Sequence, residues 1–309
     1  MSTKIRQWAP IALFIYKRPE HARRTITSLK ACLGFEESPL YVFAEGPKTE
    51  ADIPAVQATR AAARELLGPG AVYVEQDHNR GLANSIIAGT TELCERHGRV
   101  VVVEDDLTLG PSFLRFLNEG LERYEDEPRV MQVAGHMFDV PSLADKQEAL
   151  FLPMTSSWGW ATWKRAWDQF DRSASGWRER LVGAEAKRFD LGGRYDYSGM
   201  LGRQMNGDID SWAIRWNYSV FVRGGLVLYP PHTLVLNEGF DGTGTHGLLS
   251  LPVWQAQLAQ NAAFDFPALV AESPQEERVF EAIRTFRSAS APQKLKAVAK
   301  AVRSRVGGR

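Results

Sequence analysis

Short apolar runs and amphipathic stretches alternate along the first hundred residues of the chain. Four runs have the length and the β-branched or aromatic content of buried strands, at 11–16, 39–44, 71–75 and 100–103. Amphipathic stretches typical of helices follow the first three runs, at 20–33, 53–67 and 82–97. This alternation predicts a doubly wound, Rossmann-like α/β half built on a parallel sheet.

The pattern changes after residue 110. A helix is predicted at 113–124, with strands at 130–134 and 224–229. Seven of the nine tryptophans fall between 151 and 229: Trp158, Trp160, Trp163, Trp167, Trp177, Trp212 and Trp216. We therefore predict one domain over 1–270, made of halves 1–110 and 111–270, followed by a tail over 271–309.

The predicted tail is basic. From residue 282 to the end there is no acid, and there are eight Lys or Arg residues. Four apolar residues share one face of a short helix within it: Leu295, Val298, Val302 and Val306. A basic amphipathic helix is compatible with binding to an anionic membrane surface. A solvated tail or a docking helix is an equally good interpretation.

Composition narrows the choice of partners and of compartment. Lys plus Arg and Asp plus Glu both number 37, so no overall field favours nucleic acid. Cys32 and Cys94 lack metal-binding spacing and are expected to be reduced thiols. The apolar run at 9–16 is too short to span a membrane and lacks a cleavage region. We expect a cytoplasmic protein, soluble or peripheral on the cytoplasmic face of the membrane.

Three carboxylates, Glu104, Asp105 and Asp106, directly follow the valine run. Ligands of open α/β sheets bind beyond the carboxyl ends of the strands. Mg²⁺ or Mn²⁺ suits such carboxylates, because it takes one or two of them and completes its shell with phosphate and water. Strand alternation predicts that Glu104 and Asp106 point one way and Asp105 the other. The alternative is that Asp106 caps the following helix.

Several short segments resemble the GT-A glycosyltransferases in order and spacing. The likeness is greatest to eukaryotic N-acetylglucosaminyltransferase I and its relatives, and more general to family 2 glycosyltransferases. The matching segments are 44–46 (Ala-Glu-Gly), 78–83 (His-Asn-Arg-Gly-Leu-Ala), 103–107 with the Pro-x-Phe helix after it, 210–215, 229–231 and 244–247. Segment 157–163 (Ser-Trp-Gly-Trp-Ala-Thr-Trp) is similar to bacterial sugar transferases.

The resemblance implies a GT-A fold, with a mixed, mostly parallel sheet flanked by helices and a C-terminal helical tail. Residues 1–110 would bind the nucleotide and 111–270 the acceptor. It places Asp106 on a divalent ion, Mn²⁺ or Mg²⁺, and makes His246 a second ligand of the metal or the diphosphate. Asp105 would bind ribose or assist the metal, and Glu104 would contact the donor sugar. His246 as an ordinary exposed loop residue is the alternative.

The ends of the first strands are expected to hold the rest of the donor. Tyr16, Arg18 and Glu45 would lie by the nucleobase and ribose, and His78 and Arg80 beside the nucleotide. The family has an aspartate where this chain has Glu45. A lone arginine such as Arg80 is otherwise most simply a solvated surface residue.

A base and a sugar platform complete the prediction. Asp210 is our candidate base, with Asp208 as its close competitor, and the alternative is that either one caps the next helix. Trp212 could exclude water from Asp210 and is predicted to help bind the acceptor. Trp158 and Trp160 bracket a glycine and would stack on acceptor sugars, although tryptophans at such spacings also build cores.

Together these features favour a metal-dependent, inverting glycosyltransferase of the hexosyl- or N-acetylhexosaminyltransferase type. It would move a sugar from a nucleotide-sugar, such as a UDP-sugar, to a hydroxyl of a glycan or lipid-linked glycan. A sugar-nucleotide pyrophosphorylase would have a glycine-rich loop after the first strand, which here reads Tyr-Lys-Arg-Pro-Glu at 16–20. A non-catalytic carbohydrate-binding or scaffold protein on the same fold remains the alternative.

Overall fold

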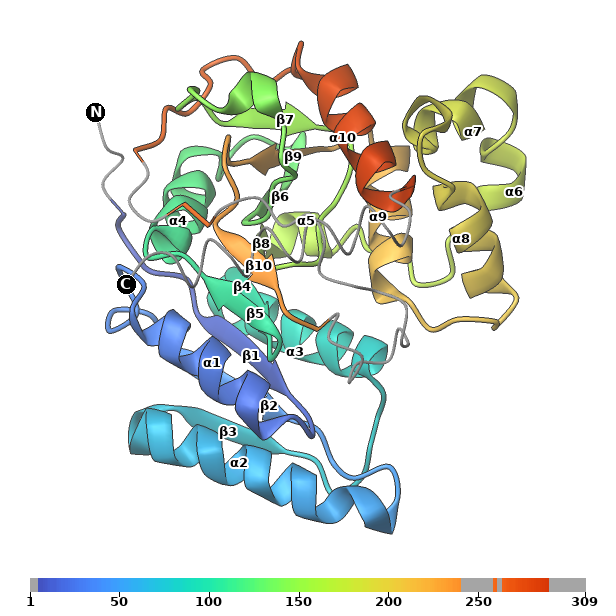
Figure 1. The fold of residues 1–309 in the computed structure, drawn as a ribbon. Coiled ribbons are helices and arrows are strands. Elements are labelled where there is room, and N and C mark those ends of the chain that lie inside the picture. Colours follow the sequence, from blue (N-terminus) through green and yellow to red (C-terminus); the bar gives the residue numbers. More distant parts are fainter. Residues whose placement is uncertain (1–4, 240–257, 260–262, 289–309) are drawn as a thin grey trace.

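The structure is a computed structural model, and it describes residues 5–239, 258–259 and 263–288. Its centre is a mixed sheet of eight strands, of which six run in one direction (Figure 1). In spatial order the strands are β3 (Val72–Glu75), β2 (Leu40–Ala44), β1 (Ile11–Ile15), β4 (Arg99–Glu104), β8 (Trp160–Trp163), β6 (Val130–Ala134), β9 (Leu226–Tyr229) and β7 (Leu150–Leu152). The predicted α/β class with a mostly parallel sheet is confirmed.

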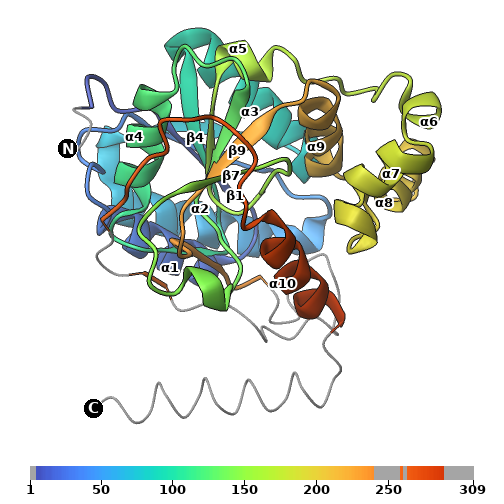
Figure 2. The same ribbon diagram turned by 90° about the horizontal axis from the view of Figure 1, so that it is seen from above.

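The first half has the predicted doubly wound order. Strands β3, β2, β1 and β4 are parallel, and Phe14 of β1 lies opposite Glu104 of β4. The connecting helices are α1 (Pro19–Lys30), α2 (Ile53–Leu67) and α3 (Leu82–His97). Because crossovers are right-handed and the chain reverses its direction across the sheet after β3, α1 and α2 cover one face and α3 the other (Figure 2).

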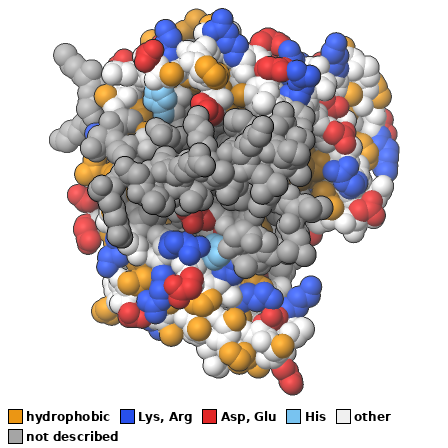
Figure 3. Space-filling view, viewed as in Figure 1, with side chains coloured by type: hydrophobic (Ala, Val, Ile, Leu, Met, Phe, Trp, Pro, Cys, Tyr) orange, Lys and Arg blue, Asp and Glu red, His pale blue; other side chains and the backbone are white. Residues whose placement is uncertain are grey.

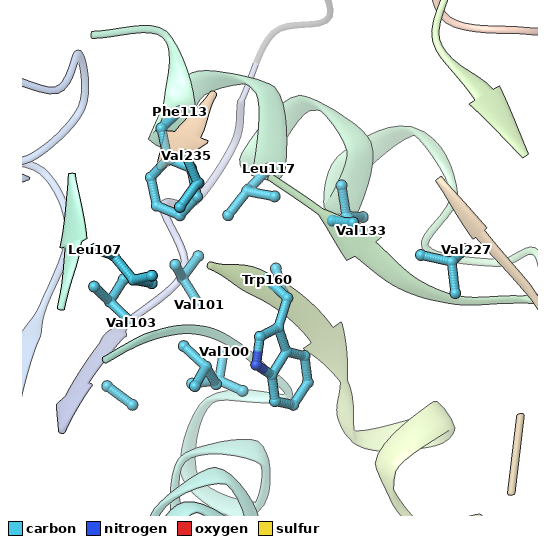
Figure 4. Close-up of a cluster of buried hydrophobic side chains, with 14 of the residues drawn as sticks. Val100, Val101, Val103, Leu107, Phe113, Leu117, Val133, Trp160, Val227 and Val235 are labelled. Carbon is cyan, nitrogen blue, oxygen red and sulfur yellow. The ribbon is translucent and has the colours of Figure 1, made fainter. Parts of the chain in front are cut away.

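The valine strand is the centre of the core. Val100, Val101, Val102 and Val103 have no exposed surface, because α3 and the helix after β5 cover opposite faces of β4. Figure 4 shows three of these valines beside Trp160 and Phe113. A fully buried valine contributes roughly 1.5 kcal/mol or more, so this strand is a rigid base for whatever follows Glu104.

The second half adds strands by antiparallel pairing. Strand β8 is inserted between β4 and β6 and is antiparallel to both. A separate two-stranded ribbon joins β5 (Leu107–Leu109) to β10 (Val235–Asn237). Helix α4 (Phe113–Arg123) begins only after β5, with Ser112 as its N-cap residue. The alternative in which Asp106 caps a helix is therefore wrong, because a strand follows it.

A helical lobe projects beside the sheet, on the right of Figure 1. It contains α6 (Trp177–Arg180), α7 (Gly183–Phe189), α8 (Tyr197–Met205) and α9 (Trp212–Val222), and α5 (Lys164–Trp167) precedes it. The lobe has a small core of its own: Ala174, Leu181, Phe189, Leu201, Ile214, Tyr218 and Phe221. Single 3₁₀ turns occur at Glu50–Asp52, Gly68–Gly70, Pro141–Leu143 and Leu191–Gly193.

Helix α10 (Glu276–Ser288) packs on the second half. Val279, Phe280 and Ile283 on its inner face are buried. The boundary at 270 stays a prediction, and the basic segment beyond 288, with its apolar face, lies outside the described residues. No helix in the described ranges is long and apolar enough to cross a membrane. Acidic and basic side chains are interspersed over the face seen in Figure 3, in keeping with the equal numbers of each.

Candidate functional site

The candidate site lies where the strand order changes direction, between β1 and β4. Arg18 follows β1, and its Nη2 atom is 2.7 Å from Oδ1 of Asp105 and 2.9 Å from Oδ2 of Asp106, both of which follow β4. Ligands of doubly wound sheets bind at this topological switch point. The structure thus brings Arg18 together with two carboxylates that lie 87 and 88 positions later in the sequence.

Glu104, Asp105 and Asp106 form an acidic turn at the end of β4. Helix α1 and the end of β1 hold this turn in place. The N–H of Tyr16 donates to Oδ2 of Asp105 at 3.0 Å, so both carboxylate oxygens of Asp105 are engaged. The buried hydroxyl of Thr25 donates to the backbone oxygen of Asp105 at 2.8 Å and accepts from the N–H of Leu107 at 3.1 Å. The predicted alternation is wrong at this point, because β4 ends at Glu104 and the following turn directs Asp105 and Asp106 to the same guanidinium.

Glu104 is the least compensated carboxyl group of the three. Its side chain makes no hydrogen bond or ion pair with any residue in the described ranges, and Arg18, whose charge acts to lower the pKa of Glu104, pairs directly with Asp105 and Asp106. Burial, followed by the charges of Asp106 and Asp105, raises the pKa of Glu104 well above its ordinary value. Burial also raises the pKa of Asp105, while the Arg18 guanidinium opposes that rise. Three carboxyl groups close to one guanidinium favour a cationic ligand, because a cation would stabilise their ionised forms.

The acidic turn fits a divalent ion delivered with phosphate. Within the described ranges no three His, Cys, Asp or Glu side chains are arranged to hold a metal ion by themselves. Mg²⁺ and Mn²⁺ do not require three, because one or two carboxylates suffice when phosphate and water fill the shell. Asp106 is suited to this role, since its side chain is 16% exposed and Arg18 engages only Oδ2. His246, the predicted second ligand, lies outside the described residues.

The end of β10 closes tightly over Asp106. The N–H of Glu238 donates to the backbone oxygen of Asp106 at 2.7 Å. A Cβ at Gly239 would lie 2.2 Å from Oδ2 of Asp106, so glycine is required for this close approach. The β5–β10 ribbon therefore helps to position the acidic turn.

Glu45 and its neighbours form a second group at the ends of β2 and β3. Oε2 of the buried Glu45 accepts a hydrogen bond from the hydroxyl of Ser85 at 2.7 Å. The backbone of Gly46 touches that of His78 so closely that an added Cβ would lie 2.5 Å away. A cavity of about 50 Å³ here includes Glu45, Ser85 and Arg80 in its lining. The predicted donor residues of this region thus lie together, with His78 and Arg80 exposed.

Tyr16 lies at the edge of the same region. Its hydroxyl donates to Oδ2 of Asp52 at 3.2 Å, and Lys17 forms an ion pair with the same carboxylate at 2.7 Å. Burial raises the pKa of Tyr16. These contacts anchor the loop between β1 and α1.

Asp210, which precedes α9, lies beside the N-terminus of α3. Its carboxylate is 62% exposed and is 3.5 Å from Arg215. Oδ2 of Asp210 is 3.7 Å from where a Cβ would stand at Gly81, the residue before α3. Asp208 is exposed as well. Neither aspartate caps α9, since Ser211 is the N-cap and its hydroxyl accepts from the N–H of Ile214, so that alternative is wrong.

The predicted tryptophan platform is divided between core and surface. Trp160 has no exposed surface, and it stacks on Trp212 with ring centroids 5.1 Å apart. Trp212 is itself buried. Neither ring has a free face for a sugar in this conformation. Trp158 is half-buried and is the member of the group with exposed surface.

Sequence reasoning did not single out His136, which contacts Trp158. The two rings meet edge to face at 4.4 Å, beyond the carboxyl end of β6. Nδ1 of His136 lies 3.3 Å from the backbone oxygen of Val235, and its buried Nε2 has no hydrogen-bond partner among the described residues. Burial lowers the pKa of His136 to about 4. A polar residue just after a strand was the available signal, as it was for Glu104.

No protein-family model matches the chain, and no curated protein matches its sequence. Three solved structures show a weak overall likeness. A protein of Desulfovibrio desulfuricans assigned as a nucleotide-diphospho-sugar transferase is 13% identical over 53% of this chain and 68% of its own, with a TM-score of 0.33. A mannose-1-phosphate geranyltransferase of Thermus thermophilus is 13% identical over 72% and 73%, with a TM-score of 0.35.

The third is mouse xyloside xylosyltransferase 1, 12% identical over 70% of this chain and 81% of its own, with a TM-score of 0.38. Likenesses this weak do not indicate a function. The function proposed below is inferred from the residues gathered at the switch point.

Proposed function

We propose that this protein is a metal-dependent glycosyltransferase that moves a sugar from a nucleotide-sugar, with UDP-sugars favoured, to a hydroxyl of a glycan or lipid-linked glycan. The observation that carries the proposal is the acidic turn at the switch point, where Arg18, Asp105 and Asp106 meet beside Glu104, whose carboxyl group has no direct partner among the described residues. A nucleotide diphosphate with its cation supplies the positive charge and hydroxyl groups that this surplus of carboxylates requires.

Each group of the donor has a candidate partner. Asp106 would hold Mn²⁺ or Mg²⁺, which supplies neutralisation of the diphosphate as it leaves. Glu104, with no partner among the described residues, is available to the hydroxyls of the donor sugar. Glu45, oriented by Ser85, would face the nucleobase. Arg18 would hold Asp105 and Asp106 in place while the donor binds.

Asp210 would take the proton from the acceptor hydroxyl. Its carboxylate is exposed, and its long contact with Arg215 leaves it free to accept a proton. A single base on the acceptor side is sufficient for direct displacement with inversion. Trp158, which meets His136 edge to face, would support the acceptor ring.

A thermal-shift panel tests the proposal. Nucleotide-sugars are added with and without Mn²⁺ to wild type, Asp106→Ala and Asp145→Asn. Asp145 is a control, because it is an exposed acid in the loop before β7, which β8, β6 and β9 separate from β4 in the sheet. A ligand that binds only the native state raises its melting temperature. We expect a Mn²⁺-dependent shift for one class of nucleotide in wild type and the control, and its loss in Asp106→Ala.

Two other results would count against the proposal. The absence of a shift with every nucleotide-sugar would contradict it. A shift that is unchanged in Asp106→Ala would show that the donor binds elsewhere.

A further inference from the structure

An open groove of about 630 Å³ runs along the exposed face of α3. Residues one or two turns apart on α3 form its floor, and Arg172, from the loop that leads to the helical lobe, forms the opposite wall. The lining residues are Arg80, Asn84, Ile87, Ala88, Thr91, Glu92 and Arg172. The proposed donor and acceptor residues do not use this groove, apart from Arg80 at its end.

The charged side chains that line the groove are two arginines and one acid, Glu92. Arg80 makes no ion pair with any described residue, and Arg172 bonds only to the neutral amide of Asn84, at 3.1 Å. Glu92, the acid of the lining, is already paired with Arg96 at 3.0 Å. Burial lowers the pKa of the nearby Arg215. The charge of Asp210 opposes that effect, and repulsion from Arg172 adds to it. An anion in the groove would relieve this excess.

The arginine wall is held in place before any ligand arrives. The carboxylate of Asp171 accepts hydrogen bonds from the backbone N–H groups of Ser173 and Ser175, at 2.8 and 2.7 Å. The N–H of Asp171 donates to the hydroxyl of Ser219 on α9 at 3.0 Å. The turn that presents Arg172 is therefore pinned to the lobe, which reduces the entropy lost on binding.

The groove also adjoins the proposed nucleobase site and lies near the proposed base. Arg80, Ala88 and Glu92 line both the groove and the small cavity at Glu45. Oδ2 of Asp210 lies 3.7 Å from where a Cβ would stand at Gly81, the residue next to Arg80. A saccharide lying in the groove would thus reach from Arg172 towards the carboxylate that we propose as the base.

We infer that this groove binds a saccharide that carries an anionic group, either a uronate carboxylate or a phosphate, with Arg172 and Arg80 contacting the anion. Guanidinium groups match planar carboxylates and phosphates through paired hydrogen bonds. The hydroxyl of Thr91 accepts from Nε1 of Trp167 at 2.9 Å and keeps its own proton to donate to a sugar hydroxyl. The assignment of this saccharide as the acceptor depends on the proposed function, whereas the binding site itself does not.

Calorimetric titration with three probes tests the inference: cellobiouronic acid, glucose 6-phosphate and neutral cellobiose. Each is titrated into wild type, Arg172→Gln and Arg178→Gln, with UDP and Mn²⁺ present so that the diphosphate site is occupied. Arg178 is a matched control, because it is exposed, lies in the same lobe and also bonds to one amide, that of Asn206, at 3.4 Å. We expect at least one anionic probe to bind wild type more tightly than cellobiose does.

The Arg172→Gln variant should bind that probe about ten- to a hundredfold more weakly, the effect of losing a charged hydrogen bond, while Arg178→Gln matches wild type. Binding should also weaken with added salt. Preference for the uronate or for the phosphate identifies which anion the groove takes. Equal binding of cellobiose and both anionic probes, or no change in Arg172→Gln, would overturn the inference.

The same proteins separate this inference from the proposed function. One outcome would be that nucleotide-sugars cause no Mn²⁺-dependent shift in melting temperature, but the anionic saccharide binds through Arg172. In that case the groove inference holds and the transferase proposal fails. If the shift is present and neither anionic probe binds, the groove inference fails alone.

Discussion

The two halves of this protein assemble their candidate residues by different physical routes. In the first half, parallel strands β1, β2 and β4 end at one edge of the sheet, so Arg18, Glu45 and Asp106 reach that edge by topology alone. In the second half, antiparallel strands and a helical lobe place each residue through packing. Trp160 and Trp212 consequently lie in the core, while Asp210 lies on the surface. Candidate residues are therefore easier to locate from sequence in the first half than in the second.

The largest expected effect tests the second half at Asp210. Asp210→Asn keeps the size of the side chain but removes its basicity, so turnover should fall by about 10²- to 10⁴-fold. The rate of sugar transfer and the affinity for the donor should be measured together. Asp208→Asn is the control, and a larger loss there would move the role of base to Asp208.

Trp160 and Trp158 should separate stability from binding. Trp160→Ala empties a position with no exposed surface and should cost about 3–5 kcal/mol in the free energy of unfolding. Trp158→Ala should cost less, because that ring is only half-buried. Urea titrations give both values. If Trp160→Ala unfolds no more easily than Trp158→Ala, the division between core and surface is wrong.

The next effect concerns the buried His136. Its pKa is lowered by burial from 6.5 to about 4. The unfolded chain therefore takes up this proton first as pH falls below 6.5, and the folded state loses about 3 kcal/mol relative to the unfolded state by pH 4. His136→Gln does not titrate and should lose that much less between neutral pH and pH 4. Parallel stability curves for the two proteins would contradict a buried neutral imidazole.

The smallest effect concerns Glu276 on α10. Burial, followed by the charges of Glu272 and Glu277, raises its pKa from 4.5 to about 7. Stability is therefore lost as pH rises through this range, and Glu276→Gln should be more stable than wild type at alkaline pH. Because the side chain is partly exposed, the gain should be only about 1 kcal/mol, and it should vanish near pH 4.5. Thermal melts at the two pH values measure it, and an equal gain at both would contradict the titration.

Sequence periodicity was sufficient to predict the bounds of helices and strands that depend mainly on local sequence. The predicted helices at 53–67 and 82–97 and the strand at 130–134 coincide with α2, α3 and β6. The spacing of their apolar residues and the glycine or proline residues at their boundaries were enough to predict these three elements.

Long-range pairing determined what periodicity missed. Strand β8 forms hydrogen bonds with β4 on one side and with β6 on the other. Strand β10 pairs with β5, which lies more than a hundred residues earlier in the sequence. The turn at Asp105 depends on Arg18 and Thr25, which the strand pattern could not indicate. Whether Asp210 or Ser211 caps α9 likewise depends on local backbone geometry.

The most direct test of the central claim is the release of nucleoside diphosphate from a nucleotide-sugar that binds the protein. It should be measured with Mn²⁺ and with a chelator, in wild type, Asp106→Asn and the Asp145→Asn control. We predict release that requires the metal, falls at least about a hundredfold in Asp106→Asn and is unchanged in the control. Binding without release in wild type, or release that is equal in Asp106→Asn, would contradict a metal-dependent glycosyltransferase centred on Asp106.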